Sequence, residues 1–173
     1  MAADRLVFVD ESGANTQMTR RHGRSPIGQR LACPVPQGHY QTTTMIAAVG
    51  LQGPQAPWLF GGVMDGELFL AWVKQGLVRC LQPDDVVVMD NLATHKVAGV
   101  REAIEATGAR LEYLPPYSPD FNPIEPMWSK VKQGLKSQAP RNARQLHKAA
   151  RAAFAAVTPT DCQGFFLHAG YAT

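Results

Sequence analysis

The sequence predicts an α/β domain in which a mixed central β-sheet is flanked by α-helices. Two short apolar runs, residues 6–9 (LVFV) and 86–89 (VVVM), have the length of strands, and each is followed directly by an aspartate. Apolar residues in the second half of the chain recur at helical spacing. Strands that come first and then alternate with helices are typical of a mixed sheet covered by helices, and wholly apolar runs suit strands buried on both faces.

Strands dominate the expected first half of the chain. Residues 6–9 predict a buried strand that stops at Asp10, because residues 11–13 (ESG) resemble a turn. Residues 30–49 are rich in β-branched and aromatic side chains and are interrupted by proline and glycine, which predicts antiparallel strands joined by a turn. Residues 58–60 (WLF) predict one further strand.

Helices dominate the expected second half. The spacing of apolar residues predicts a helix over 67–81 that ends before Pro83. The run 86–89 predicts the next strand. The remaining elements expected from the sequence are a helix over 96–107, a strand over 110–114, and helices over 124–136, 142–157 and 159–168.

Bulk properties predict a single domain over residues 1–173. The formal charge of +3 fits a nucleic-acid partner and fits an ordinary slightly basic protein equally well. No apolar run approaches the roughly 20 residues of a spanning helix, and the first residues lack the form of a signal peptide, so we expect a cytoplasmic protein without a membrane partner. Glycine loops for phosphate, GxSxG elbows and zinc-ligand clusters are all missing from the sequence.

Carboxylate side chains at the ends of the predicted strands indicate the chemistry of the site. If the strands that end at Asp10 and Asp90 are neighbours, the roughly 4.8 Å between strands brings both carboxylates to one edge of the sheet. Adjacent anions raise each other's pKa unless a cation lies between them, and hard oxygen ligands suit Mg²⁺ or Mn²⁺. Glu125, at the start of the helix after a proline-rich loop, is the candidate for a third carboxylate.

Local structure offers another explanation for each of these residues. Residues 122–125 (NPIE) are a good helix start, with Asn as N-cap, Pro in the first turn and Glu125 in a capping position. An aspartate after a strand is commonly a turn residue or a helix cap. Helix and turn rules alone therefore leave both interpretations open.

Three segments resemble a known family. They are residues 8–12 (FVDES), 88–96 (VMDNLATHK) and 114–125 (LPPYSPDFNPIE), and together they resemble bacterial insertion-sequence transposases of the mariner-like superfamily, which carry a DDE catalytic domain. The 34 residues between Asp90 and Glu125 are similar to the aspartate-to-glutamate spacing of that family. The resemblance extends over nearly the whole chain, from Asp10 into the C-terminal helices.

The resemblance implies an RNase H-like fold and a DNA transposase catalytic domain. Asp10, Asp90 and Glu125 match the catalytic positions of the family, where they would bind two Mg²⁺ or Mn²⁺ ions. Such a site would cleave phosphodiester bonds and then use a DNA 3′-hydroxyl for strand transfer, without a covalent protein intermediate. The expected partners are transposon ends and target DNA, with a homodimer that brings two ends together at the bacterial nucleoid.

Basic residues provide candidates for DNA contacts, mainly to phosphate. The densest cluster, residues 19–24 (TRRHGR), resembles a basic stretch of the same family, and two lysines share the Glu125 face of its helix. A solvated lysine face, or a helix-start role for residues 95–96, explains these positions as well. The candidates are Arg20, Arg21, Arg24, His95, Lys96, Lys132 and Lys136.

Other prominent residues are expected to be structural. Glu11 should point to the opposite side of its strand from Asp10, where it is expected to be structural or, alternatively, to support the metal ligands, and Glu67 should lie at a helix start. Trp58, Trp72 and Trp128 are expected in the core rather than in base stacking.

Only nine residues precede Asp10, whereas relatives carry helix-turn-helix modules there, so we expect that module to be absent or separately encoded. Two rival functions stay open: a catalytically inactive DNA-binding or dimerisation remnant of a transposase, and an RNase H-like nuclease without strand transfer.

Overall fold

The computed structural model describes residues 3–20, 22–32, 34–37, 40–116 and 118–172. Its centre is a five-stranded sheet in the order β3-β2-β1-β4-β5. The first three strands pair antiparallel, whereas β4 and β5 run parallel to β1, so the sheet is mixed as predicted. The strands are β1 (Leu6–Asn15), β2 (Thr42–Gly50), β3 (Gly53–Gly61), β4 (Val86–Met89) and β5 (Arg110–Tyr113).

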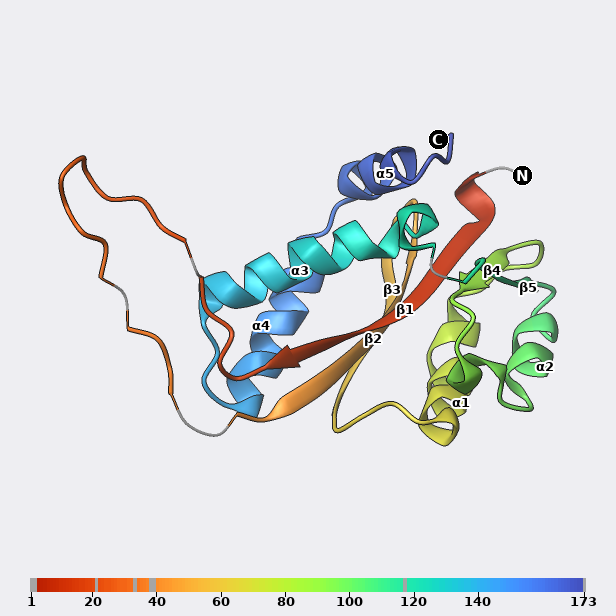
Figure 1. Ribbon diagram of the computed structural model, residues 1–173. Helices are drawn as coiled ribbons and strands as arrows, with labels where there is room; N and C mark the ends of the chain where they lie inside the picture. The colour runs from red at the N-terminus through yellow and green to blue at the C-terminus, as the bar shows by residue number, and fades with distance from the viewer. Residues whose placement is uncertain (1–2, 21, 33, 38–39, 117, 173) are drawn as a thin grey trace.

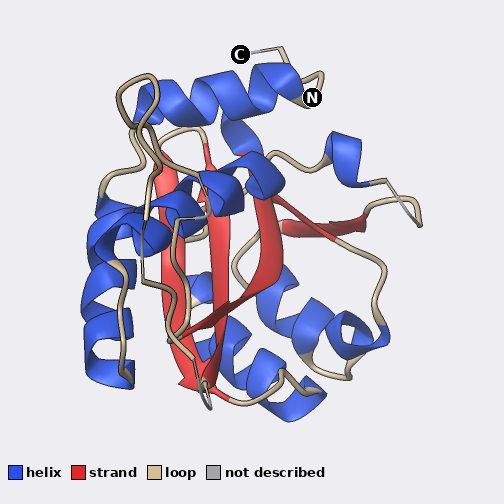
Figure 2. Cartoon of the chain, turned by 60° about the vertical axis from the view of Figure 1, so that its left-hand side comes forward, coloured by secondary structure: helices blue, strands red, loops and turns tan. Residues whose placement is uncertain are grey.

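Helices cover both faces of this sheet (Figures 1 and 2). The α-helices are α1 (Gly66–Gln75), α2 (Val100–Glu105), α3 (Ile124–Gln138), α4 (Ala143–Ala155) and α5 (Pro159–His168), and short 3₁₀ turns are η1 (Ala3–Arg5), η2 (Leu77–Arg79), η3 (Ala93–Lys96) and η4 (Pro119–Phe121). Side chains alternate along a strand, so Leu6 and Phe8 pack with α3, α4 and α5, while Val7 and Val9 pack with α1 and α2. The sheet therefore separates two hydrophobic cores.

The first strand is longer than predicted. β1 continues through Asp10 to Asn15, because β2 pairs with it along that whole length, from Phe8↔Val49 to Asn15↔Thr42. The expected turn at residues 11–13 is wrong. Local turn propensity gave way to the hydrogen bonds that a long antiparallel partner supplies.

The expected pair of strands over residues 30–49 is also wrong. Among the described residues of this range, only those from Thr42 onward form a strand, and that strand pairs with β1 and β3. Pro34 and Pro36 lack the N–H group that a strand ladder requires. The described residues between 16 and 41 instead form an arm that extends from the body beyond the end of β1 (Figure 1).

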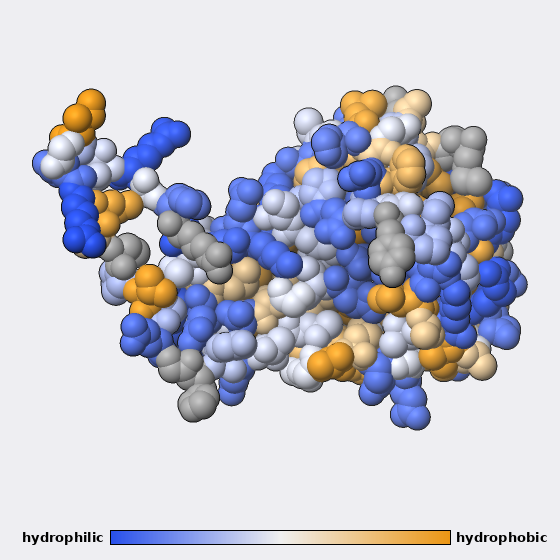
Figure 3. Space-filling model, viewed as in Figure 1, coloured by the Kyte–Doolittle hydropathy of each residue, from blue (hydrophilic) through white to orange (hydrophobic). Residues whose placement is uncertain are grey.

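The arm carries exposed apolar side chains as well as basic ones. Ile27, Leu31, Val35 and Tyr40 are among the exposed large hydrophobic residues of the described chain. Figure 3 shows the arm standing apart from the body, with hydrophilic and hydrophobic groups side by side along it.

The remaining predictions differ from the structure mainly at element ends. The predicted helix 96–107 is divided into η3 and α2, and Gly99 between them has a positive φ of 93°. The predicted strands at 58–60, 86–89 and 110–114 are confirmed as β3, β4 and β5, as are the last three helices. Among the helices of the described residues, none has both the length and the apolar character that crossing a bilayer requires.

Candidate active site

Sheet topology brings Asp10 and Asp90 to the same place. β1 and β4 are parallel neighbours, and their last pair is Val9↔Met89, so the two aspartates follow in register. Asp90 comes directly after β4, whereas Asp10 lies within the longer β1 and pairs with Ala47 of β2 on its other side. The predicted neighbouring strands are therefore confirmed, with Asp10 inside its strand rather than at its end.

Glu125 joins them from the first turn of α3. All three carboxylates line one open cavity of about 390 Å³, together with residues of the loops before η3 and α3. The cap explanation for Glu125 finds no support in the described residues, because the N–H of Asn122 has another acceptor. It donates to the carbonyl of Pro119 at 2.9 Å.

Burial and neighbouring negative charges mark this cavity as a site for a cation. The pKa of the Asp10 carboxyl rises from 3.8 to about 7, mainly because burial disfavours the anion. The negative charges of Glu11, Glu125 and Asp90 raise it further, against a backbone hydrogen bond from Glu11 that lowers it. A divalent cation between these carboxylates would reverse that balance.

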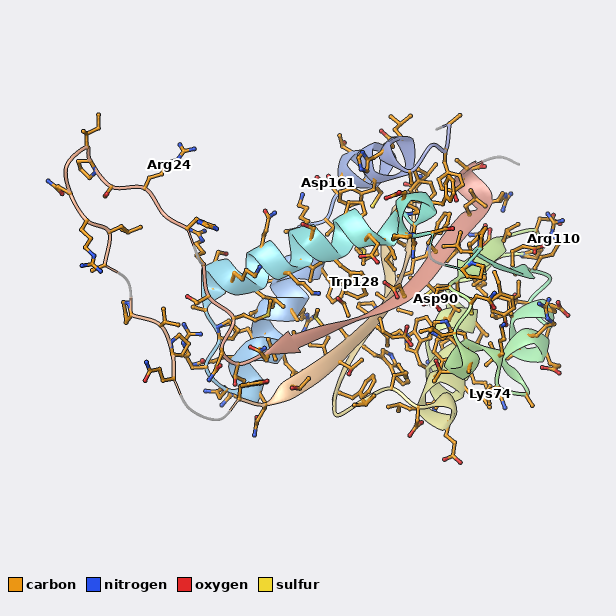
Figure 4. The ribbon with its side chains drawn as sticks, viewed as in Figure 1. Arg24, Lys74, Asp90, Arg110, Trp128 and Asp161 are labelled. Atoms are coloured by element: carbon orange, nitrogen blue, oxygen red, sulfur yellow. The ribbon has the colours of Figure 1, made fainter. Side chains whose placement is uncertain are left out.

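Trp128 holds Asp10 from the opposite helix. Its indole Nε1 donates a hydrogen bond to Asp10 Oδ2 at 3.1 Å, and the residue is only 2% exposed. Trp128 follows Glu125 by three residues, so both lie on one side of α3. Figure 4 shows Trp128 and Asp90 near the middle of the molecule beside β1.

His95 holds Asp90 in a comparable way. Its Nδ1 lies 2.5 Å from Asp90 Oδ1, and its Nε2 lies 3.0 Å from both carboxylate oxygens of Glu11. Burial lowers the pKa of this imidazole, but hydrogen bonds to Asp90 and Glu11 raise it to about 10 on balance. Only the doubly protonated ring can donate from both nitrogens to carboxylates.

The residues present fit a divalent metal by the chemistry of their donors. Three hard carboxylates converge on one cavity, and their mutual repulsion calls for a cation. Within the part of the chain that the structure describes, no three His, Cys, Asp or Glu side chains already have the arrangement of a closed metal site. Asp10 and Asp90 each use one oxygen in the bonds to Trp128 and His95, and the second oxygen takes no part in those bonds.

The predicted DNA contacts divide into two groups. Arg20 and Arg24 are exposed on the arm, and Arg21 lies outside the described residues. Arg20 and Lys136 line the same cavity between the arm and α3, while Lys132 is half-buried on α3. The structure thus brings part of the basic cluster close to the helix that carries Glu125.

His95 and Lys96 do not form a similar pair. The His95 ring is fully buried, so it has no surface with which to meet a phosphate. The alternative of a helix-start role is also wrong, because His95 lies in the last turn of η3. Lys96 is exposed, and its Nζ lies 5.5 Å above the ring of Tyr113.

Two pairings in the site were not predicted from the sequence, that of Trp128 with Asp10 and that of His95 with Glu11. Trp128 was expected in the core, which is confirmed, but its bond to Asp10 joins residues 118 positions apart. Glu11 does lie on the opposite side of β1 from Asp10, yet its partner His95 is 84 positions away. Such pairings depend on strand order, which no local pattern in the sequence contains.

Known proteins share this architecture. The fold is similar to a Mos1 transposase paired-end complex with the left transposon end, at a TM-score of 0.77 and 16% identity, over 95% of this chain and 52% of that one. A Mos1 mariner paired-end complex with Mn gives 0.75 and 18%, over 96% and 52%. The catalytic domain of Mos1 mariner transposase gives 0.65 and 16%, over 98% and 84%. No match was found among curated proteins.

These likenesses confirm the predicted RNase H-like fold, and the chain spans about half the length of the transposases in the two paired-end complexes. The family model described as DDE superfamily endonuclease matches residues 5–147, which include all three carboxylates and both of their ring partners. The chain therefore belongs to the DDE superfamily endonuclease family.

Proposed function

We propose that the chain is the catalytic domain of an insertion-sequence transposase that cleaves and joins DNA strands. The site consists of Asp10, Asp90 and Glu125, which hold two Mg²⁺ or Mn²⁺ ions. One observation supports this most: three carboxylates from three separate elements line one open cavity, where burial, together with the neighbouring negative charges, raises the pKa of Asp10 to about 7. Family membership and the mariner-type fold point the same way.

The roles of the residues follow from their positions. Bound ions would activate the attacking water or 3′-hydroxyl and stabilise the leaving oxygen of a phosphodiester. Asp10 is fixed by the sheet and by Trp128, and Asp90 is fixed by His95, so neither carboxylate needs to be ordered when DNA arrives. Glu125 is exposed at the cavity, in the first turn of α3.

DNA is the proposed substrate, as transposon ends first and target DNA second. One similar structure is a complex with a transposon end, which supports this substrate by analogy. We extend the proposal to a homodimer, to a helix-turn-helix portion encoded separately, and to action at the nucleoid in the bacterial cytoplasm.

Cleavage and joining assays test the function. A supercoiled plasmid and a pre-cut oligonucleotide end are incubated with the chain and Mg²⁺ or Mn²⁺, beside the variants Asp90→Ala and Glu125→Ala. The expected result is metal-dependent nicking and joined products from the unchanged chain, and the loss of both with either variant. Arg110→Ala, on β5 at the far edge of the sheet, is the matched control and should keep both activities.

The same assay separates the rivals. Nicking without any joining of the pre-cut end identifies a nuclease that lacks strand transfer. An inactive but folded chain that still binds DNA in the presence of Mn²⁺ identifies a remnant. Equal activity in the Asp90→Ala variant would contradict the assignment of the site.

A further inference from the structure

The sheet does not hold the side chain of Asp90, whose Oδ1 accepts a hydrogen bond from the N–H of Leu92 at 3.4 Å. It follows the last residue of β4, outside the strand ladder, and its side chain is 36% exposed. A carboxylate in that place has no strand neighbour to fix its rotamer. A ligand that is free to rotate would bind metal less tightly than one already held in position.

The different lengths of β1 and β4 leave space beside Asp90 for a supporting residue. β4 ends at Met89, opposite Val9, whereas β1 continues for six more residues. Glu11 therefore lies beyond the end of β4, on the face of β1 opposite to Asp10. The loop after Asp90 turns into η3 and brings His95 to this place.

The His95 ring is held at both of its nitrogens and on one face. Both of its nitrogens face carboxylates, Asp90 on one side and Glu11 on the other. Its plane stacks on Phe69 with 4.4 Å between ring centroids and an interplanar angle of 28°. The backbone carbonyl of His95 accepts a hydrogen bond from the hydroxyl of Tyr113 at 3.2 Å. The ring cannot turn without breaking several of these contacts at once.

We propose that His95, anchored by Glu11, is a positioning residue that holds the Asp90 carboxylate in the orientation in which it binds metal. The inference rests on the proposed function, because it requires Asp90 to be a ligand. Two neighbouring residues of β1 then serve the same site. Asp10 is a ligand, and Glu11 anchors the ring that orients Asp90. Hydrogen-bonded partners of this kind commonly change metal affinity by about 10- to 100-fold when removed.

Mn²⁺ binding tests the proposal without reference to activity. Isothermal titration calorimetry gives the Mn²⁺ affinity of the unchanged chain and of Glu11→Ala, Glu11→Gln and Asp90→Ala, each checked for folding by circular dichroism. Glu11→Ala should weaken Mn²⁺ binding by about 10- to 100-fold. Glu11→Gln keeps an oxygen acceptor for the ring and should bind Mn²⁺ close to the unchanged chain.

A matched control separates positioning from stability. Ile104→Ala removes a fully buried side chain from the hydrophobic core that also contains Phe69, away from the carboxylates. It should lower the Tm and leave the Mn²⁺ affinity of the folded protein unchanged. If Glu11→Ala does not fold, Glu11→Asp withdraws the carboxylate from the ring by one methylene and should weaken Mn²⁺ binding in the same direction.

The outcomes are distinguishable. The proposal is overturned if the folded Glu11→Ala or Glu11→Asp variant binds Mn²⁺ as tightly as the unchanged chain while Asp90→Ala does not. It is also overturned if Glu11→Gln is as weak as Glu11→Ala, since the charge of Glu11 rather than its hold on the ring would then matter. If Asp90→Ala binds Mn²⁺ normally, the metal site is elsewhere, and the proposed function fails together with this inference.

Discussion

Burial and like charges act together on Asp10. The side chain lies within a central strand, three other carboxylates are near it, and the result is a pKa of about 7 instead of 3.8. If Asp10 had no function, its replacement by a neutral side chain would increase the stability of the folded protein. The unfavourable arrangement makes physical sense when a cation completes the site.

The pH dependence of folding should report this directly. Because the folded pKa of Asp10 lies above its ordinary value, its contribution to stability is fully present below pH 3.8 and is lost as the pH rises through 7. A difference of about 3 pH units corresponds to about 4 kcal/mol. In EDTA, the free energy of unfolding of Asp10→Asn minus that of the unchanged chain should therefore increase by up to about 4 kcal/mol between about pH 4 and pH 8.

Urea unfolding of both proteins across this pH range is the measurement. A difference between them that stays constant with pH would show that Asp10 is not strained in the metal-free chain.

The Nε1–H group of Trp128 should contribute to metal affinity by holding Asp10. Trp128→Phe keeps an aromatic ring in the core but removes the Nε1–H that Asp10 accepts. We expect a folded protein whose Mn²⁺ affinity is weaker by about tenfold, the lower end of the effect of such partners. Calorimetry checks this, with Trp58→Phe, a half-buried tryptophan outside the cavity, as the control. Equal losses in the two variants would argue against a specific role for Trp128.

Motifs in the sequence identified the three carboxylates but not the groups that hold them. Asp10, Asp90 and Glu125 stand in recognisable local patterns. The partners Trp128 and His95 meet their carboxylates only after the sheet and α3 have assembled, and His95 was predicted to face DNA although it is buried.

At the scale of elements, α3 depends on close contact with α4. A Cβ atom added to Gly134 would lie 3.0 Å from the Cβ of Ala153, which is tighter than ordinary packing. Gly134→Val should therefore push the helices apart and destabilise the chain by about 1–3 kcal/mol. Gly164→Val in α5 is the control, because nothing lies within 4 Å of its added Cβ. Urea unfolding that shows equal stability for the two variants would contradict this account of the α3–α4 contact.

Elements were predictable where local pattern and tertiary context agreed. β4 and α5 have the predicted bounds, since an uninterrupted apolar run suits one buried strand, and Thr158 as cap with Pro159 in the first turn defines one helix start. The predicted turn at residues 11–13 was wrong because pairing with β2 outweighed the turn propensity of these residues. The prediction of strands before Thr42 was wrong because, in the described residues of 30–41, β propensity without a partner strand gives an arm rather than a sheet.

At the scale of the whole molecule, positive charge is carried away from the body by the arm. Arg24 stands on it, far from the sheet (Figure 4). If the arm binds phosphates, Arg20→Ala with Arg24→Ala should weaken binding to all duplex sequences alike. The slope of log affinity against log salt should become shallower by about 0.9 for each phosphate that the variant no longer neutralises.

Fluorescence anisotropy with labelled duplex DNA at several salt concentrations measures this slope. Arg110→Ala, an exposed arginine on the edge strand β5, should leave it unchanged. A double variant with the same slope as the unchanged chain would remove the arm from the DNA-binding surface.

Metal binding by the three carboxylates is the central claim, and anomalous diffraction from crystals soaked in Mn²⁺ tests it most directly. The prediction is strong anomalous density in the cavity between Asp10, Asp90 and Glu125, absent from crystals of Asp90→Ala. Well-ordered carboxylates with no Mn²⁺ between them, in crystals that bind Mn²⁺ elsewhere, would contradict the account.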